Sequence, residues 1–519
     1  MNIMKHLLLT IALLSIHGIL GAQITYQKLY TTTNNSQANC IRATADGGFI
    51  SCGGGGSGFW ILKADSNGTT TWGRSFTSLF RILSVKQTTD GGYAACGSWN
   101  NGQGKFQAML LKLNASGAIQ WANAYGDTAS SAAIDLEQTA GGGFILAGNI
   151  SSGSPLQDLY IIKTDPSGNL GWAKRFQSAN NTTETASGII TKNNQYYISG
   201  NVQLSPADAD ALLMKIDTAG QLIWTYRYDV AGNREFASEV RNTADGNLLM
   251  IGYTEGATQD PDMLLLKADT TGAVIWSKTG SGAGSEYGSS LVENPDQSIV
   301  IAGSADSSGN NRNVILIKVT NTGNLVWSKQ YGGNGLEQVL QNGLDRSADG
   351  GFVVQATTIG SFSSGGSKNI YVIKTNNDGI SYCNAIPHTF QLSAVSINRN
   401  AYSLPPVNTG ASFTLTPAPG STGSDTTLCF VTALQENDGP SIGVLLYPNP
   451  AFDRLTLKCD QPVISVTIFT PDGRKMMESI YPQSPEQTDL DIQHLSGGSY
   501  LLQVETKTGS KTIKFNKQE

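Results

Sequence analysis

The sequence predicts an all-β protein whose main part is a seven-bladed β-propeller. A segment of about fifty residues occurs seven times, each time with a Gly-rich turn, an apolar strand, a Lys, a second turn and a Trp. A fixed period in this range indicates one supersecondary unit copied in a ring or a stack. Charged residues make up only 14% of the chain and glycine occurs 59 times, which suits short strands joined by tight turns.

One lysine recurs at the same point of every copy, and a tryptophan follows it. The lysines are Lys63, Lys112, Lys163, Lys215, Lys267, Lys318 and Lys374. Successive lysines are 49, 51, 52, 52, 51 and 56 residues apart. The tryptophans are Trp72, Trp121, Trp172, Trp224, Trp276 and Trp327, and the seventh copy has Tyr382 instead. Seven copies predict seven blades.

Each copy contains four candidate strands. In the third copy they cover 132–137, 144–147, 159–163 and 171–176, with glycine-containing turns between them. Four short antiparallel strands in about fifty residues form one propeller blade. The three residues before each repeat lysine are apolar and do not alternate with polar ones, so both faces of that strand are expected to be buried, as in blades that stack on two neighbours.

The two ends of the repeat region predict a closed ring. Residues 24–30 resemble a fourth strand such as 327–331, whereas the seventh copy's own fourth strand, around 381–384, is degenerate. We expect the N-terminal strand to complete the last blade, which would remove the exposed sheet edges.

The chain divides into four parts by composition. Residues 1–22 have one Lys, an apolar stretch and a small-residue end, which are typical of a secretory signal peptide cut before Gln23. No Cys follows that site, and the apolar stretch is too short to span a bilayer. The propeller is predicted over 23–383, a Ser/Thr/Pro/Gly-rich linker over 384–440, and a C-terminal domain over 441–519.

Export permits disulfides, and the chain has six cysteines. Cys383 and Cys429 bracket the predicted linker and are the favoured pair. Cys40 with Cys52, or Cys52 with Cys96, remain alternatives, because six cysteines allow fifteen pairings and the sequence does not choose.

The Asp-turn-Gly-x-x-x-Trp element of the repeats resembles two propeller families. In 268–276 it is similar to the tryptophan-docking repeat of quinoprotein-type propellers, with a turn one residue shorter, and to the Asp-box of sialidase-type propellers. In both families the element fastens the third strand to the fourth. The resemblance implies that structural role for the matching tryptophans and for Asp65, Asp165, Asp217 and Asp269.

The C-terminal eighty residues resemble the type A sorting domain of type IX secretion substrates. A Tyr-Pro-Asn-Pro motif, a Leu-Ser-Gly-Gly-x-Tyr motif and a terminal Lys-bearing strand carry the resemblance, through Tyr447, Pro448, Asn449, Pro450, Gly497, Gly498, Tyr500 and Lys511. It implies a small Ig-like β-sandwich that the type IX machinery recognises at the outer membrane. The protein would then be released outside the cell or attached to the cell surface.

The residue inventory of the repeats excludes several kinds of catalytic site. Histidine is absent from them, since the four histidines are His6, His17, His388 and His494. Histidine-based triads and metal sites are therefore excluded from the propeller, although hydrolysis by paired carboxylates stays open. The net charge of -6, without a basic run, argues against nucleic acid as a partner. No cofactor motif occurs.

The repeated charged residues have structural explanations. Asp46, Asp90, Asp245 and Asp349 lie in Asp-Gly turns and are expected to accept hydrogen bonds from the turn backbone. We expect the repeat lysines to pair with these aspartates rather than to bind an anion. A second acidic set, Asp158, Asp210 and Asp262, begins the third strands, and Asp208 or Asp260 adds a further carboxylate. Carboxylates of this kind can bind calcium, but the oxygen ligands here are few and scattered, so no metal is predicted.

Trp99 lies outside the repeat pattern, in a Gly- and Asn-rich loop between second and third strands. Such loops line the face on which propellers bind ligands, as do 201–208 and 253–260. With Asn100 and Asn101, Trp99 is the candidate ligand-binding site, because an exposed Trp beside amides suits a sugar ring. The alternative is a Trp folded onto its own blade.

These observations favour a monomeric, secreted or surface-bound propeller that binds a glycan or a protein, without catalysis. A polysaccharide-active hydrolase or lyase that uses acidic and Tyr residues is the first alternative, and a quinoprotein-like oxidoreductase is the second. The signal peptide would direct export through the inner membrane.

Overall fold

The structure is a computed structural model of the 519-residue chain. It describes residues 23–31, 37–55, 58–77, 79–100, 102, 104–153, 156–180, 182–256, 260–282, 284–307, 311–360, 368–381, 385–415, 424–432, 444–449, 451–470, 475–483, 485–507 and 509–518. Two compact units result, Gln23–Val431 and Thr432–Glu519, and each is described by itself. The predicted signal peptide lies outside the described residues.

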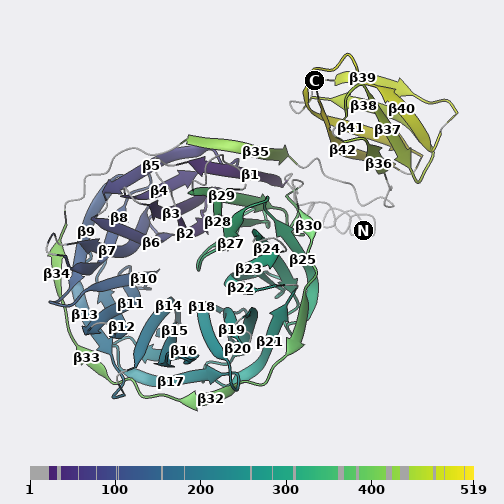
Figure 1. Ribbon diagram of the computed structural model, residues 1–519. Helices are drawn as coiled ribbons and strands as arrows, with labels where there is room; N and C mark the ends of the chain where they lie inside the picture. The colour runs from purple at the N-terminus through teal and green to yellow at the C-terminus, as the bar shows by residue number, and fades with distance from the viewer. Residues whose placement is uncertain are drawn as a thin grey trace, which may run out of the picture. The chain divides into compact units, whose positions relative to one another are not determined.

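The first unit is a ring of seven antiparallel blades around a central axis (Figure 1), of which the last two are joined into one sheet. The first strand of each blade lies innermost and the fourth lies at the rim, as in a β-propeller. Blades 1 to 3 contain β2 (Gln37–Ala43), β3 (Phe49–Gly55), β4 (Gly58–Ala64) and β5 (Thr70–Thr77); β6 (Phe80–Gln87), β7 (Tyr93–Asn100), β8 (Phe106–Leu113) and β9 (Ile119–Gly126); and β10 (Ser131–Gln138), β11 (Phe144–Gly153), β12 (Leu156–Thr164) and β13 (Leu170–Phe176).

Blades 4 to 6 repeat this order. They contain β14 (Thr183–Lys192), β15 (Gln195–Ser205), β16 (Asp208–Asp217) and β17 (Leu222–Asp229); β18 (Arg234–Asn242), β19 (Leu248–Glu255), β20 (Pro261–Ala268) and β21 (Val274–Ser281); and β22 (Glu286–Glu293), β23 (Ile299–Ser307), β24 (Asn311–Val319) and β25 (Leu325–Tyr331). The prediction of seven blades is confirmed. The third strands are buried on both faces, as their apolar runs predict.

Blade 7 closes the ring with the two ends of the repeat region. Its inner strand is split into β26 (Leu336–Gln338) and β27 (Leu344–Arg346), and β28 (Phe352–Ile359) and β29 (Lys368–Thr375) follow. The fourth strand is β1 (Ile24–Thr31), which pairs antiparallel with β29 from Tyr26↔Lys374 to Tyr30↔Ile370. The N-terminal strand therefore completes the last blade, as predicted.

The first part of the segment 384–440, which its composition predicts as a linker, contains short paired strands. Five short strands there pair one after another with the outer strands of blades 6, 5, 4, 3 and 2, and they form a belt that runs backwards around the rim (Figure 1). They are β30 (Ile386–Pro387), β31 (Gln391–Ala394), β32 (Asn398–Ala401), β33 (Pro406–Asn408) and β34 (Ala411–Thr414). A sixth strand, β35 (Ser424–Thr432), pairs with β1. The belt covers edges that would otherwise expose unpaired backbone groups.

The belt is anchored by single apolar side chains that enter the clefts between blades. Phe390 joins the cluster of blades 5 and 6, Leu404 that of blades 3 and 4, and Leu415 that of blades 1 and 2. Ile397 packs from the belt against the cluster of blades 4 and 5. Composition alone does not reveal such a segment, because the anchors are isolated among exposed Ser, Thr, Pro and Asn.

The repeat tryptophans dock against the next blade. A side chain at Gly168, where φ is +79°, would meet the ring of Trp121 at 2.5 Å, so only glycine fits under this indole. Trp72 Nε1 donates to the carbonyl of Ala115 in the next blade at 3.2 Å. Asp165 accepts the backbone N–H groups of Ser167 and Asn169 at 2.9 and 2.8 Å. The fastening role that the family resemblance implies is thus visible in the contacts.

Most repeat lysines pair with turn aspartates, as predicted. The pairs at 2.6–2.8 Å are Lys63–Asp46, Lys112–Asp90, Lys267–Asp245 and Lys374–Asp349. Blades 3 and 4 have no turn aspartate at this point, and Lys163 and Lys215 instead donate to the carbonyls of Thr218 and Thr270 in the following blade.

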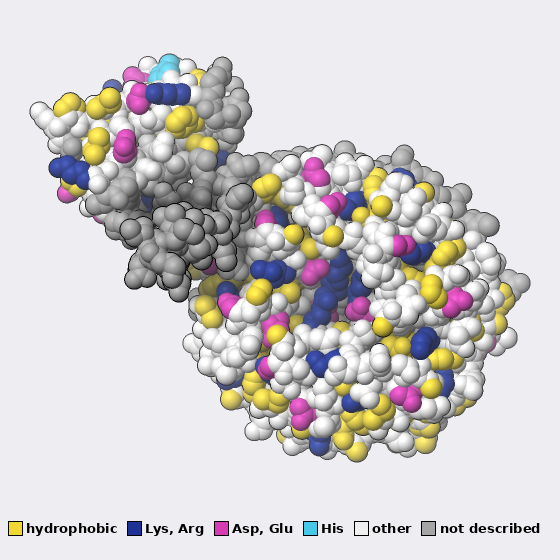
Figure 2. Space-filling model, turned by 180° about the vertical axis from the view of Figure 1, so that it is seen from behind, with side chains coloured by type: hydrophobic (Ala, Val, Ile, Leu, Met, Phe, Trp, Pro, Cys, Tyr) yellow, Lys and Arg dark blue, Asp and Glu magenta, His cyan; other side chains and the backbone are white. Residues whose placement is uncertain are grey.

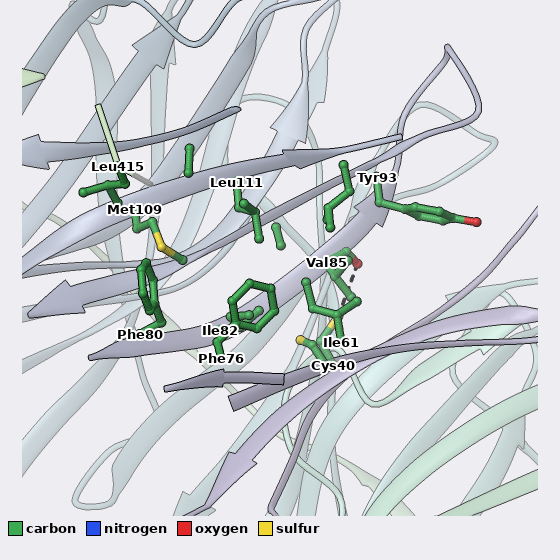
Figure 3. Packing of buried hydrophobic residues seen from close by; sticks show 14 of the residues in the cluster. Cys40, Ile61, Phe76, Phe80, Ile82, Val85, Tyr93, Met109, Leu111 and Leu415 are labelled. Atoms are coloured by element: carbon green, nitrogen blue, oxygen red, sulfur yellow. Dashed lines mark hydrogen bonds between the residues drawn. The ribbon is translucent and has the colours of Figure 1, made fainter. Parts of the chain in front are cut away.

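Cys40, Cys52, Cys96 and Cys459 are free thiols in the structure, and all four are buried. Cys40 and Cys52 face each other across β2 and β3, and Cys40 lies near Ile61 and Val85 in the cluster of blades 1 and 2 (Figure 3). The two alternative pairings among Cys40, Cys52 and Cys96 are therefore not formed. The favoured Cys383–Cys429 pair cannot be compared, because Cys383 lies outside the described residues.

The second unit is a two-sheet β-sandwich. One sheet has the order β36-β37-β40 and the other β39-β38-β41-β42. The strands are β36 (Val444–Tyr447), β37 (Arg454–Cys459), β38 (Val463–Phe469), β39 (Lys475–Ile480), β40 (Gln487–Asp491), β41 (Gly498–Thr506) and β42 (Gly509–Lys517). Their inward residues, among them Leu457, Val466 and Leu502, form one core.

None of the described residues belongs to a helix that is long and apolar enough to cross a membrane.

Candidate functional site

The inner strands of blades 1 to 6 share an irregularity that shapes the central channel. Each has a β-bulge two to four residues after its start, and a bulge re-aims the extra side chain. The bulged residues are Asn39, Leu83, Ile134, Ser187, Ser238 and Ser289. In blade 7 the segment 339–343 separates β26 from β27 at the corresponding place.

Four of these bulged residues line a pocket in the channel. The pocket has a volume of about 410 Å³ and is called the channel pocket below. Its lining residues are Asn39, Leu83, Ser238, Tyr253, Tyr287, Gly288, Ser289, Ser304, Arg312, Gln338, Val339, Leu340 and Gln341. They come from blades 1, 2, 5, 6 and 7, so only the closed ring assembles the pocket.

Aromatic rings form one wall of the channel pocket. Phe236 and Tyr253 stack with 4.9 Å between ring centroids, and Tyr287 meets Tyr253 edge-on at 5.2 Å. The Arg312 guanidinium lies 4.5 Å from the centroid of Tyr287, within cation–π range. Both tyrosines are half-buried, so each ring has a packed side and an accessible side.

The arginines of this wall are held by acidic partners. Arg312 Nε and Nη2 donate to the two carboxylate oxygens of Asp306 at 2.6 and 3.1 Å, and this hydrogen bonding raises the pKa of Arg312. Arg234 pairs with Glu255 at 2.8 Å and lies 5.0 Å from the ring centroid of Phe236. A bidentate pair fixes the plane of the guanidinium as well as its position. The wall is therefore pre-organised.

The tyrosine of blade 5 is held in its neutral form. Burial raises the pKa of Tyr253 to about 12, and Glu255 and Tyr287 add to the shift. A general base works best when its pKa lies near the operating pH. Tyr253 can thus stack and donate a hydrogen bond, but it is poorly placed to take a proton at neutral pH.

A buried ion network lies a few residues further along the same inner strands. Arg42 of blade 1 pairs with Glu239 of blade 5 at 3.2 Å across the channel, and Arg241 pairs with the same carboxylate at 2.7 Å. Lys86 of blade 2 pairs with Asp135 of blade 3 at 3.3 Å. Burial opposes ionisation of Asp135, but Lys86 and Arg42 lower its pKa. Figure 2 shows Lys and Arg side chains gathered with acidic ones in the hollow of the ring.

The predicted ligand-binding residues lie elsewhere in the fold. Trp99 is at the end of β7, half-buried, and packs against the cluster of blades 1 and 2. Asn100 accepts a hydrogen bond from the backbone of Gly102, and Asn101 lies outside the described residues. Trp99 and Asn100 do not line the channel pocket. Their role in binding stays a prediction.

Sequence reasoning did not select Tyr287 or Arg312, although Tyr253 opens one of the loops expected on the binding face. The available signal was disagreement between copies: the position of Tyr287 carries Thr185 in blade 4 and Ala132 in blade 3. Which of the variable positions meet in space depends on the closure of the ring.

The predicted sorting residues lie on the strands of the sandwich and their turns. Tyr447 is exposed at the end of β36, and Asn449 accepts a hydrogen bond from the backbone of Asn516 at 3.0 Å. Tyr500 stacks on Phe515 with 5.6 Å between centroids and donates to the carbonyl of Ser496. Lys511 pairs with Val504 across β41 and β42, and Gly498 begins β41. Pro450 lies outside the described residues.

Comparisons with known proteins extend these observations. No curated protein matches the chain. Three of the solved structures that match are an ulvan lyase from a polysaccharide lyase family (8% identity, 67% of this chain and 96% of that one, TM-score 0.45), a protein of unknown function from Dyadobacter fermentans (10%, 68% and 98%, 0.38) and Drosophila Plexin A in complex with Semaphorin 1b (7%, 68% and 87%, 0.38).

One family model matches the C-terminal unit. It is described as a secretion system C-terminal sorting domain and covers residues 445–518, which include all seven strands of the sandwich except the first residue of β36. The expectation drawn from the Tyr-Pro-Asn-Pro and Leu-Ser-Gly-Gly-x-Tyr motifs is confirmed. The chain is a secreted seven-bladed β-propeller protein that ends in a type IX secretion system sorting domain.

Proposed function

We propose that the propeller is a glycan-binding module that acts outside the cell, and that the channel pocket is its binding site. The observation that carries the proposal is the wall of Tyr253 and Tyr287 beside Arg312, in a pocket that is also lined by serine hydroxyl groups of the same two blades and by amide groups of blades 1 and 7. A sugar ring offers apolar C–H faces to aromatic rings and hydroxyl groups to amides. Binding sites of this kind combine aromatic walls with a few placed polar groups.

The chemistry of the lining favours binding over catalysis. Its described residues include Ser, Asn, Gln, Tyr and one Arg, but no Asp, Glu or His. Glycoside hydrolysis ordinarily needs two carboxyl groups on either side of the bond. The raised pKa of Tyr253 also speaks against proton abstraction by this residue in a lyase reaction.

The binding proposal predicts the effect of removing one ring. In a glycan-array screen followed by titration, Tyr287→Ala should weaken binding of the best glycan roughly three- to tenfold, since an aromatic contact contributes about 0.5–1.5 kcal/mol. Tyr287→Phe, which keeps the ring, should bind nearly as well as the unchanged protein. Thermal unfolding of each variant checks that the ring is intact.

Trp99→Ala is the matched control, because it removes an aromatic side chain that does not line the channel pocket. It removes a half-buried aromatic residue from blade 2, away from the channel pocket, and should leave affinity unchanged. Loss of binding with Trp99→Ala but not with Tyr287→Ala would move the site to blade 2 and refute the channel pocket. Release of reducing or unsaturated sugar ends by the purified protein would instead support the hydrolase or lyase alternative.

The sorting domain predicts the location of a shortened chain. A chain that ends at Pro440 should accumulate in the periplasm, because the segment that the type IX machinery recognises is missing, and cell fractionation measures this. Residues 441–519 fused to a periplasmic reporter protein should bring the reporter to the surface. Normal surface delivery of the shortened chain would contradict the assignment.

A further inference from the structure

Three carboxylates from three strands meet at the junction of blades 4 and 5. Asp210 lies on β16, Asp229 ends β17 and Glu235 lies on β18. One carboxylate oxygen from each lies within 4.8 Å of the other two. The third residue arrives from the next blade, so the cluster forms only when the two blades pack together.

The cluster contains a buried oxygen without a side-chain partner. Glu235 is 0% exposed, and its Oε1 accepts a hydrogen bond from Thr254 at 2.9 Å, whereas its Oε2 has no side-chain partner and the backbone of Val230 is the one further donor to this carboxylate among the described residues. A buried carboxylate with so few donors carries a large desolvation cost. Asp210, at 2% exposure, has one guanidinium partner, Arg227. Burial and the neighbouring carboxylates raise the pKa of Glu235 to about 8 and that of Asp210 to about 6, so these groups oppose one another's ionisation, which a bound cation would reverse.

Blades 3 and 5 provide an internal comparison. The positions of Asp210 and Glu235 are occupied by Asp158 and Glu184 at the junction after blade 3, and by Asp262 and Glu286 at the junction after blade 5. The third position to compare lies at or just after the end of the outer strand, five residues after the repeat tryptophan. It is occupied by Gln177 in blade 3, Asp229 in blade 4 and Ser281 in blade 5. Asp229 is therefore the residue that turns a two-carboxylate arrangement into a three-carboxylate one.

Space for further ligands adjoins the cluster. A pocket of about 430 Å³ is lined by Asp208, Asp210, Asp229 and Asn233, by Arg227, which pairs with Asp210, and by Asn400 of the belt. Asp208 is exposed and Asn233 lies in the turn between the blades, so both can supply oxygen atoms. Water molecules can complete the coordination from the open side.

We propose that Asp210, Asp229 and Glu235 bind a calcium ion that fastens blade 4 to blade 5. An all-oxygen set of carboxylates with room for an amide oxygen and water is the chemistry that calcium takes, with six to eight ligands in flexible geometry. Extracellular calcium sites commonly have dissociation constants of about 10⁻⁴–10⁻³ M, which suits an exported protein. The expectation that the chain binds no metal is thereby revised at this junction.

The test uses the full-length protein after chelation and dialysis. Addition of calcium chloride should raise the melting temperature by several degrees, and titration calorimetry should show one site per chain. Asp229→Ser, which installs the residue found at this place in blade 5, should abolish both signals without lowering the melting temperature in chelator. Magnesium chloride in place of calcium should give a smaller shift, because magnesium demands octahedral geometry.

Asp262→Asn is the matched control, since it neutralises the corresponding aspartate one blade further on. It should leave the calcium response unchanged. Absence of a calcium-dependent shift and of binding heat in the unchanged protein would overturn the proposal, as would an undiminished response in Asp229→Ser. Equal loss in Asp229→Ser and Asp262→Asn would also overturn it, because the response would then not originate at this junction.

Discussion

A chain that ends at Ser381 is expected to be far less stable than one that ends at Thr432. The shorter chain lacks all six strands that follow the last blade, including the buried anchors Phe390, Leu404 and Leu415. Burial of each such side chain contributes about 1.5–3 kcal/mol. The three together contribute roughly 5–9 kcal/mol, which is comparable to the whole stability of many domains.

Differential scanning calorimetry of the two chains measures the effect. Both lack the sorting domain, so the comparison isolates the belt. We expect a fall of more than about 10 °C in the melting temperature, or no cooperative transition at all, for the chain that ends at Ser381. Leu404→Ala in the longer chain is the milder version and should cost about 2–5 kcal/mol. Equal melting temperatures would show that the belt does not contribute to the stability of the propeller.

Loss of the carboxylate that joins blade 1 to blade 5 is expected to have the second-largest effect. Glu239 is 2% exposed, pairs with Arg42 and Arg241, and accepts hydrogen bonds from Ser290 Oγ at 2.6 Å and the backbone of Leu291 at 3.1 Å. Glu239→Ala leaves two guanidinium groups without their shared carboxylate. Removal of one partner of a buried pair typically costs about 3–5 kcal/mol. Urea unfolding of the purified protein measures this cost.

Asp90→Asn is the control for this prediction. It also removes a carboxylate from an ion pair, Lys112–Asp90 at 2.8 Å, but the Asp90 side chain is 54% exposed. An exposed pair contributes about 0–1 kcal/mol, so the variant should unfold close to the unchanged protein. Similar costs for both variants would mean that burial does not govern the strength of these pairs.

The blades and their closure could be predicted because local signals repeat. Three signals recur at a near-constant period: glycines in the turns, a lysine near the end of each third strand and a docking tryptophan. The tryptophan of one blade contacts a glycine of the next blade, so this contact joins repeats that are adjacent in the sequence. The closing strand could be predicted because residues 24–30 resemble a fourth strand such as 327–331. The belt has no such period, since its strands are two to four residues long over blades 2 to 6 and its anchors are single apolar residues.

The two candidate sites could not be predicted, because each is formed by residues of more than one blade. The channel pocket joins Asn39, Tyr253 and Gln338, which are far apart in the sequence and come from three blades. Asp210 belongs to an acidic series that recurs in the sequence. Its partners Asp229 and Glu235 lie on an outer strand and on the inner strand of the next blade, outside that series. Their approach depends on how one blade packs on the next, which the residue pattern of a single blade does not contain.

The pairing of β1 with β29 has a consequence for the order of folding. Gln27 accepts a hydrogen bond from the Tyr371 hydroxyl at 2.6 Å, and the two residues are 344 positions apart. β1 lies between β29 and β35, which both follow nearly the whole repeat region in the chain, so β1 has no strand partner on either side until they are available. Contacts of such long sequence separation slow folding. Until then both edges of β1 are open, and they are where an incompletely folded chain is most exposed to aggregation or proteolysis.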